Sequence, residues 1–229
     1  MKTLMAPIHR AGWPFIILFA GITLILFIFS YVIGLFGALF TGWCIYFFRN
    51  PHRITPIGEG LILSPADGII TKIENALPPA ELKWVKKPLT RISIFLNVFD
   101  VHVNRIPVDG VITKIHYHPG KFFNASLDKA SEFNERNSVL IQTASGEDIL
   151  VVQIAGLIAR RILCEVKAEK QVKAGEVYGI IRFGSRADIY LPEGVHPQVV
   201  EGQRMIGGET ILADLHSKSP RRLGENRNG

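Results

Sequence analysis

Hydrophobic residues are unevenly distributed along the 229-residue chain, and the longest apolar run lies near its start. From Ala11 to Phe48, 38 residues pass without a formally charged side chain. One membrane-spanning helix needs about 20 apolar residues, so this run is long enough for two spans. Lys2 and Arg10 precede the run and Arg49 follows it. Positive charge at both ends predicts a helical hairpin with both ends in the cytoplasm, and one long tilted span is the alternative.

A secretory signal is a poorer interpretation of this run, because the apolar core of such a signal has only about 7–15 residues. We therefore expect residues 1–50 to form a transmembrane anchor in the cell membrane, with the rest of the chain on the cytoplasmic side. Pro51, Pro56 and Gly58 mark the exit from this anchor.

Beyond residue 60 the pattern changes to short runs rich in Ile and Val, separated by turn residues such as Asp67-Gly68 and Pro119-Gly120. The runs are LILS at 61–64, GIITKI at 68–73, RISIFLNVF at 91–99, GVITKIHYH at 110–118, SVLIQTA at 138–144, DILVVQIAG at 148–156, RILCEV at 161–166 and YGIIRF at 178–183. Strands at this spacing predict a mainly β (α+β) protein built as a sandwich or barrel. The clearest helical spacing lies at 126–136.

The chain therefore divides into three parts. Residues 1–50 are the anchor, 51–215 form one β-rich domain, and 216–229 are polar and aperiodic, which predicts a disordered tail.

Charge and cysteine content indicate the compartment and the partners to expect for the protein. The net charge of +6 is spread along the chain and favours an anionic membrane surface. The sequence has no basic stripe interleaved with aromatic residues, so nucleic acid is not an expected partner. Cys44 lies in the apolar run and Cys164 in a β-like run, which favours free thiols in a reducing cytoplasm over a disulfide.

A Gly-Ser pair, Gly184-Ser185, lies in the tetrapeptide FGSR near the end of the β-rich part. A serine hydroxyl lies close to the carbonyl of the residue before it. The hydroxyl can attack that carbonyl where the turn is strained and a base is near. Taken alone, a Gly-Ser pair is an ordinary turn.

Other short motifs carry groups that can assist a serine. SPADG places Asp67 in a turn after a strand, and FDVHVNRIP places Asp100 and His102 two residues apart, on one side of an extended segment. Each has an ordinary structural explanation, because Asp67 before Gly68 suits a turn and a strand histidine is usually solvated. A carboxylate, an imidazole and a serine are nevertheless the components of an activated nucleophile.

Together these motifs resemble the phosphatidylserine decarboxylases, in particular the short proenzymes with an FGSR processing site. The resemblance covers nearly the whole chain. It rests on five segments in the same order: FFRNPHR at 47–53, SPADG at 64–68, IFLNVFDVHVNRIP at 94–107, YHPGKFFNASLDKASEFNERN at 117–137 and IRFGSRADIYLP at 181–192.

The chain departs from the family pattern in two places. Asn50 and His52 replace the Asp and Glu of the usual FFRDPER. Arg105 stands where longer members of the wider family carry a second histidine, which leaves open what assists His102.

The resemblance implies that the chain makes its own cofactor. Ser185, deprotonated by His102 with Asp67 as the orienting carboxylate, would attack the carbonyl of Gly184. The ester would eliminate to dehydroalanine, and hydrolysis would release ammonia and leave a pyruvoyl group at position 185. A large chain, 1–184, and a small chain, 185–229, would remain together as a heterodimer, with higher assembly left open.

The resemblance also implies the reaction, that of a carboxy-lyase of phospholipid biosynthesis. The pyruvoyl group would form a Schiff base with the amine of phosphatidylserine, carbon dioxide would leave, and phosphatidylethanolamine would result. His102 is expected to govern the proton that replaces carbon dioxide. Arg182 or Arg186 would meet the phosphodiester. No metal and no added cofactor are expected.

Two other functions fit parts of the sequence. A membrane-tethered zinc peptidase would use His116 and His118 of HYHPG, with His102 or Asp100 as a further ligand. A non-enzymatic, lipoyl-like adaptor is suggested by VKAGEVYGIIRFGS at 172–185, although this segment has no lysine at a hairpin tip.

Overall fold

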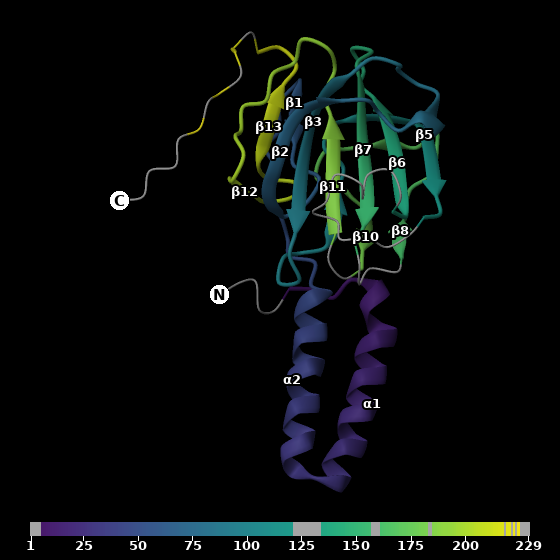
Figure 1. Cartoon of the computed structure of the whole chain (residues 1–229), viewed down its shortest axis with the longest axis vertical. Helices are drawn as coiled ribbons and strands as arrows, with labels where there is room; N and C mark the ends of the chain where they lie inside the picture. Colours follow the sequence, from purple (N-terminus) through teal and green to yellow (C-terminus); the bar gives the residue numbers. More distant parts are fainter. Residues whose placement is uncertain are drawn as a thin grey trace.

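The computed structural model describes residues 6–120, 134–156, 161–182 and 185–217, together with 219, 220, 222 and 224. A β-rich body stands on a pair of helices that project from one of its ends (Figure 1). The predicted fold class, mainly β with an apolar helical N-terminus, is confirmed.

The helix pair consists of α1 (Trp13–Phe29), which follows a short 3-10 turn, η1 (Arg10–Gly12), and of α2 (Tyr31–Phe47). Ser30 joins the two helices in an extended conformation and so reverses the chain without a loop. A β-carbon at Gly37 would lie 2.9 Å from the Thr23 hydroxyl, so the helices approach closely where this glycine has no side chain.

The outer surfaces of the helix pair are apolar and exposed, as a membrane anchor requires. Among the described residues, Arg10–Phe29 is the one helical segment long and apolar enough to cross a membrane; Tyr31–Phe47 is apolar but shorter. The N-terminal part of the chain is therefore consistent with membrane anchoring.

The described part of the β-rich body contains thirteen strands and a second 3-10 turn, η2 (Ala80–Leu82). The strands are β1 (Leu61–Leu63), β2 (Gly68–Ala76), β3 (Leu89–Leu96), β4 (Val103–Arg105), β5 (Gly110–His118), β6 (Arg136–Gln142), β7 (Asp148–Ala155), β8 (Ile162–Cys164), β9 (Gln171–Val172), β10 (Val177–Ile181), β11 (Ser185–Tyr190), β12 (Arg204–Met205) and β13 (Ile211–Asp214).

Eight of these strands form one antiparallel sheet in the order β12-β2-β3-β11-β7-β6-β5-β9. This sheet curls into a half-barrel, and the register shifts in the β2–β3 and β5–β6 pairs are irregularities of the kind that bend a sheet (Figure 1). A three-stranded sheet, β4-β10-β8, and a two-stranded sheet, β1-β13, complete the body.

The two faces of the large sheet bury different side chains, because successive residues of a strand point to opposite sides. Its inner face packs a cluster that is mainly Ile and Val, including Ile92, Val139 and Ile189. The outer face packs a Leu-rich cluster with Tyr190 and with Leu82 of the η2 turn.

Each of the eight predicted Ile- and Val-rich runs overlaps a strand; these strands are β1, β2, β3, β5, β6, β7, β8 and β10. The sequence did not predict β11. The helix predicted at 126–136 lies mostly outside the described residues, and at its end it is wrong, because Arg136 begins β6. Most of the tail predicted from His216 onward also lies outside them.

Candidate active site

Ser185 is the first residue of β11 and lies at the end of the sheet that faces the helix pair (Figure 1). In the strand register it lies opposite Leu96 of β3 and Ala155 of β7. Its side chain is fully buried and its Oγ has no hydrogen-bond partner. A buried hydroxyl without a partner costs free energy, so this position calls for a functional explanation. Gly184, the other half of the predicted cleavage site, lies outside the described residues.

Buried amides gather at the same end of the inner face. The Nδ2 of Asn137 donates to the Oε1 of Gln153 at 3.0 Å, and the Nε2 of Gln153 donates to the Oδ1 of Asn104 at 2.8 Å. Gln153 shares a face of β7 with Ala155, the register partner of Ser185. The chain of amides therefore connects β6 and β7 of the large sheet to β4 of the three-stranded sheet, close to the Ser185 level.

His102 is completely buried just before β4. Its Nδ1 lies 3.0 Å from the main-chain oxygen of Asp100, which can only accept, so Nδ1 carries the hydrogen. Its ring lies 4.2 Å, centroid to centroid, from that of Phe47 at the end of α2. Burial lowers the pKa of His102 to about 4. The imidazole is therefore neutral at cellular pH, with its hydrogen on Nδ1.

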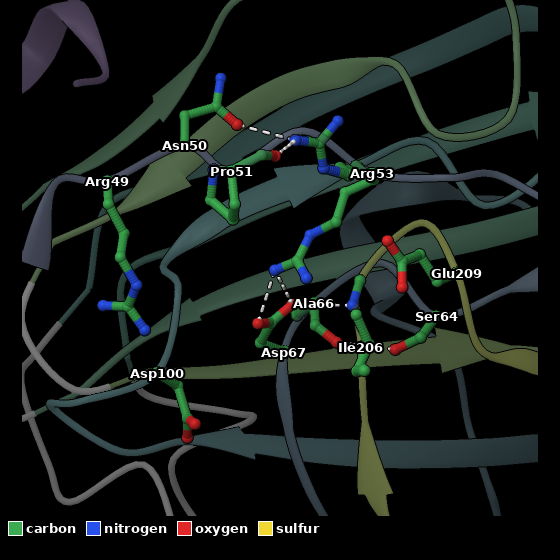
Figure 2. A network of polar contacts seen from close by, with 12 residues as sticks. Arg49, Asn50, Pro51, Arg53, Ser64, Ala66, Asp67, Asp100, Ile206 and Glu209 are labelled. Atoms are coloured by element: carbon green, nitrogen blue, oxygen red, sulfur yellow. Dashed lines mark hydrogen bonds and ion pairs between the residues drawn. The ribbon is translucent and has the colours of Figure 1, made fainter. Parts of the chain in front are cut away.

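Asp67 lies in the turn between β1 and β2 (Figure 2). The Nη2 of Arg53 is 2.8 and 2.7 Å from its two oxygens, and the Gly207 amide donates to Oδ1 at 2.8 Å. Burial raises the pKa of Asp67, and Arg53 opposes that rise. These contacts differ from the predicted orienting contact with His102, whose Nδ1 is held by the Asp100 main chain instead.

The carboxylate that acts on His102 electrostatically is that of Asp100, two residues before it. Asp100 is buried; its Oδ1 accepts from Nη1 of Arg204 at 2.6 Å, and its Oδ2 accepts from the Asn97 amide at 2.9 Å. From the sequence, Asp100 and His102 share one side of an extended segment, but the predicted orienting role falls to Asp67, and Asp100 is expected only as a candidate zinc ligand. Its spacing from His102 was the available signal, since residues two apart in an extended segment share a side.

The two arginines beside the processing site have different surroundings. Arg182 is half-buried at the junction with the helices; its guanidinium lies 5.1 Å from the ring centroid of Phe15 in α1, and its Nε has no hydrogen-bond partner. Arg186 is buried, and its Nε lies 2.9 Å from the Oδ1 of Asp188. The Nε of Arg182 thus has no hydrogen-bond partner at the junction with the helices, whereas Arg186 forms an internal ion pair.

Arg105, which stands in place of a second histidine, hydrogen-bonds to two separate parts of the chain. Its Nη1 donates to the main-chain oxygen of Gly175 at 2.9 Å. Its Nη2 donates to the Oδ1 of Asn50 at 2.7 Å and to the main-chain oxygen of Pro51 at 2.9 Å. Arg105 therefore fastens the segment that leaves the anchor to the β-rich body.

No group of three or more His, Cys, Asp or Glu side chains converges as metal ligands among the residues that the structure describes. The zinc-peptidase alternative, which needs His116 and His118 with a further ligand, thus finds no ligand set there.

A buried serine without a partner, a neutral imidazole and two carboxylates held by arginines lie in a β-rich body next to an apolar helix pair. This combination is that of a membrane-associated enzyme with a serine at its centre.

The comparisons with known proteins define that class. Residues 40–213 match the phosphatidylserine decarboxylase family. A phosphatidylserine decarboxylase proenzyme of Cereibacter sphaeroides is 57% identical over 227 residues, which are 99% of this chain and 98% of that protein. Proenzymes of the same name from Rickettsia bellii and Ruegeria pomeroyi are 57% and 58% identical, over 94% and 93% of this chain and 94% and 97% of their own lengths.

The chain belongs to the phosphatidylserine decarboxylase family. The resemblance stated from the motifs is confirmed, and with it the prediction of a pyruvoyl-dependent carboxy-lyase made as a proenzyme that is processed into chains. The zinc-peptidase and adaptor alternatives are set aside.

Proposed function

We propose that this protein decarboxylates phosphatidylserine to phosphatidylethanolamine at the cell membrane, after cutting itself between Gly184 and Ser185. The observation that carries the residue assignment is the Oγ of Ser185, which is fully buried and has no hydrogen-bond partner. The large chain would be residues 1–184 and the small chain 185–229. The pairing of β11 with β3 and β7 supports a heterodimer that stays together after the cut.

Self-processing would begin with Ser185. A bond forms between its Oγ and the carbonyl carbon of Gly184, while its proton passes to Nε2 of His102. The proton then moves to the amide nitrogen of residue 185 as the carbon–nitrogen bond breaks, which leaves an ester. The neutral imidazole of His102 then takes the Cα proton of residue 185 as the Cβ–Oγ bond breaks, which leaves Gly184 with a carboxylate and position 185 as dehydroalanine. Water then replaces the nitrogen, and ammonia departs.

The low pKa of His102 suits this role. A neutral imidazole can accept the Ser185 proton at neutral pH, and its acid form, with a pKa of about 4, returns the proton readily to the departing nitrogen. The hydrogen bond from Nδ1 to the Asp100 carbonyl fixes the tautomer, so that the ring hydrogen is on Nδ1 and the basic lone pair on Nε2. Asp100 supplies negative charge that favours the transient imidazolium. Asp67 keeps in this proposal the supporting role that the sequence motifs gave it.

The surroundings of Ser185 also fit the pyruvoyl group that its cleavage would create. The side chains beside it in the register, Leu96 and Ala155, are apolar and buried, so the position excludes water. The group supplies an electron sink for the pair left behind when carbon dioxide departs. His102 would then hold the proton that replaces carbon dioxide, on Nε2.

A lipid substrate is supported by where these groups lie. Arg182 sits at the boundary between the β-rich body and α1, with an unpartnered Nε that suits a phosphodiester oxygen. Of the two arginines expected to bind phosphate, we retain Arg182. The positive residues that flank the helix pair favour a β-rich body on the cytoplasmic side.

The test is the intact mass of the purified chain together with turnover of phosphatidylserine vesicles. Wild type should give two chains, the smaller beginning with a pyruvoyl group, and should release carbon dioxide from the lipid but not from free serine. Ser185→Ala should remain one 25.5 kDa chain without activity. A fully active, uncut Ser185→Ala protein would overturn the assignment.

A further inference from the structure

The segment that leaves the anchor, residues 49–54, passes close to Asp67, and Figure 2 shows the Arg53 side chain reaching from it to that carboxylate. It is held at both ends. Arg105 binds Asn50 and Pro51, and the main-chain amide of Ile54 donates to Oε1 of Glu209 at 3.0 Å. Arg53 lies between these two fastenings, so its side chain starts from a fixed point.

Arg53 spans the gap from this segment to Asp67. One guanidinium nitrogen reaches both carboxylate oxygens, and the Arg53 and Asp67 side chains are 10% and 16% exposed. An ion pair this well shielded from water depends on its partner, since removing one member leaves an uncompensated buried charge.

Without Arg53, the surroundings of Asp67 favour its protonated form. Burial raises the pKa of Asp67, and the negative charge of Asp100 raises it further. The Gly207 amide and the Arg53 guanidinium oppose these effects, and Arg53 has the largest opposing effect.

The other cations that face Asp67 are engaged elsewhere. Arg204 reaches Asp100 at 2.6 Å, and Arg105 holds the segment after the anchor. Arg49 donates to the main-chain oxygens of Tyr46 and Phe99. None of the three donates to Asp67 among the described contacts, so none can simply take over from Arg53.

We propose that Arg53 is a positioning residue of the active site, which holds the Asp67 carboxylate ionised and in one orientation. The segment that follows the membrane anchor then contributes a residue to the catalytic site, in addition to linking the anchor to the β-rich body. Arg53 can act in this way only if Asp67 serves the processing reaction proposed above.

The experiment follows cleavage of newly made full-length chain, in detergent, from pH 5 to pH 9. In Arg53→Met, Asp67 should gain a proton more easily, so the pH below which cleavage fails should rise. An opposite charge within about 4–6 Å typically changes a carboxyl pKa by about 1–3 units, so we expect a shift of at least one pH unit. Cleavage should therefore fall off at a higher pH than in wild type and recover as the pH is raised toward 9. Arg53→Lys, which keeps the charge, should restore most of the wild-type profile.

Arg136→Met is the matched control. Arg136 pairs with Glu81 at 2.5 Å on the outer face of the sheet, and the two side chains are 8% and 16% exposed. Its loss should lower stability to a similar degree without moving the pH profile of cleavage. Arg53→Gln, which removes the charge but keeps N–H donors, repeats the test if Arg53→Met does not fold.

Three results would overturn the proposal. They are a wild-type profile in Arg53→Met, slowing by the same factor at every pH, and failure of both uncharged variants to fold when Arg136→Met folds. Failure of the proposed function would give a different result from these three, because the wild-type chain itself would then remain uncleaved. Wild-type cleavage by Asp67→Asn would instead remove Asp67 itself from the reaction.

Discussion

Ser185 and Arg186 are neighbours in β11 and point to opposite faces of the eight-stranded sheet. The Ser185 side chain lies level with Leu96 and Ala155, whereas Arg186 pairs with Asp188, the next residue along β11 on its own side. Two adjacent residues of the FGSR motif therefore have separate tasks. In the proposed function the serine serves the reaction, and the arginine forms an ion pair on the other face of the sheet.

This separation predicts that Arg186→Met damages stability more than chemistry. Among the described residues, the one cation left near Asp188 would be Arg91, whose Nη1 is 3.8 Å away, so we expect a loss of about 3 kcal/mol in the free energy of unfolding. The double variant Arg186→Met/Asp188→Met should recover part of that loss, because it leaves no buried charge unpaired. Urea unfolding in a Ser185→Ala background measures both. Equal losses in the single and double variants would contradict this explanation.

Arg182→Ala should affect lipid binding and leave self-processing intact. A hydrogen bond to a charged group contributes about 1.5–3 kcal/mol, so the KM for phosphatidylserine should rise about 10- to 100-fold. The measurement is turnover in mixed micelles of varied phosphatidylserine content. Arg10→Ala is the control, since Arg10 lies at the same junction but is exposed and paired with Glu165. An unchanged KM in Arg182→Ala would remove Arg182 from the lipid site.

His102 makes stability depend on pH in a defined window. Its pKa is about 4 in the folded protein against 6.5 for an ordinary histidine, so below pH 6.5 the unfolded chain takes up a proton that the folded chain refuses. Stability is complete above pH 6.5 and is lost as the pH falls toward 4, by about 3 kcal/mol in total. His102→Gln, in the Ser185→Ala background, should lack this part of the pH dependence. Urea unfolding at pH 7.5 and 4.5 provides the comparison, and parallel losses in both proteins would refute it.

The buried amide chain predicts a stability loss in Gln153→Ala. Its removal leaves the Nδ2 of Asn137 and the Oδ1 of Asn104 without the partner each has now. An unsatisfied buried polar group costs about 1–3 kcal/mol, so the total loss should be about 2–5 kcal/mol. Gln142→Ala, at an exposed position of β6, should cost well under 1 kcal/mol by the same urea measurement. Similar losses in the two variants would argue against the amide chain.

The strand that carries Ser185 shows why local pattern was not enough. SRADIY at 185–190 alternates charged and small residues and has none of the Ile- and Val-rich character of the predicted strands. All six of its residues are buried, because Arg186 and Asp188 neutralise each other on the outer face. In a hydrophobicity pattern, Arg186 and Asp188 each count as a polar residue. The folded sheet shows that the two side chains form an ion pair and can therefore be buried.

The sequence by itself determined the apolar anchor, the β-rich body and the family, because hydrophobic periodicity and short motifs are local properties of the chain. It also supplied the candidate residues Ser185, His102 and Asp67. Only the tertiary structure shows what these residues contact. Asp67 pairs with Arg53, and the imidazole of His102 bonds to the main chain of Asp100. Arg105, in turn, binds the segment that follows the anchor. Some of these contacts join residues that are far apart in the chain, and others depend on the burial of both partners. The side chains become buried only when the sheets pack around the site, so a local sequence pattern cannot show these contacts.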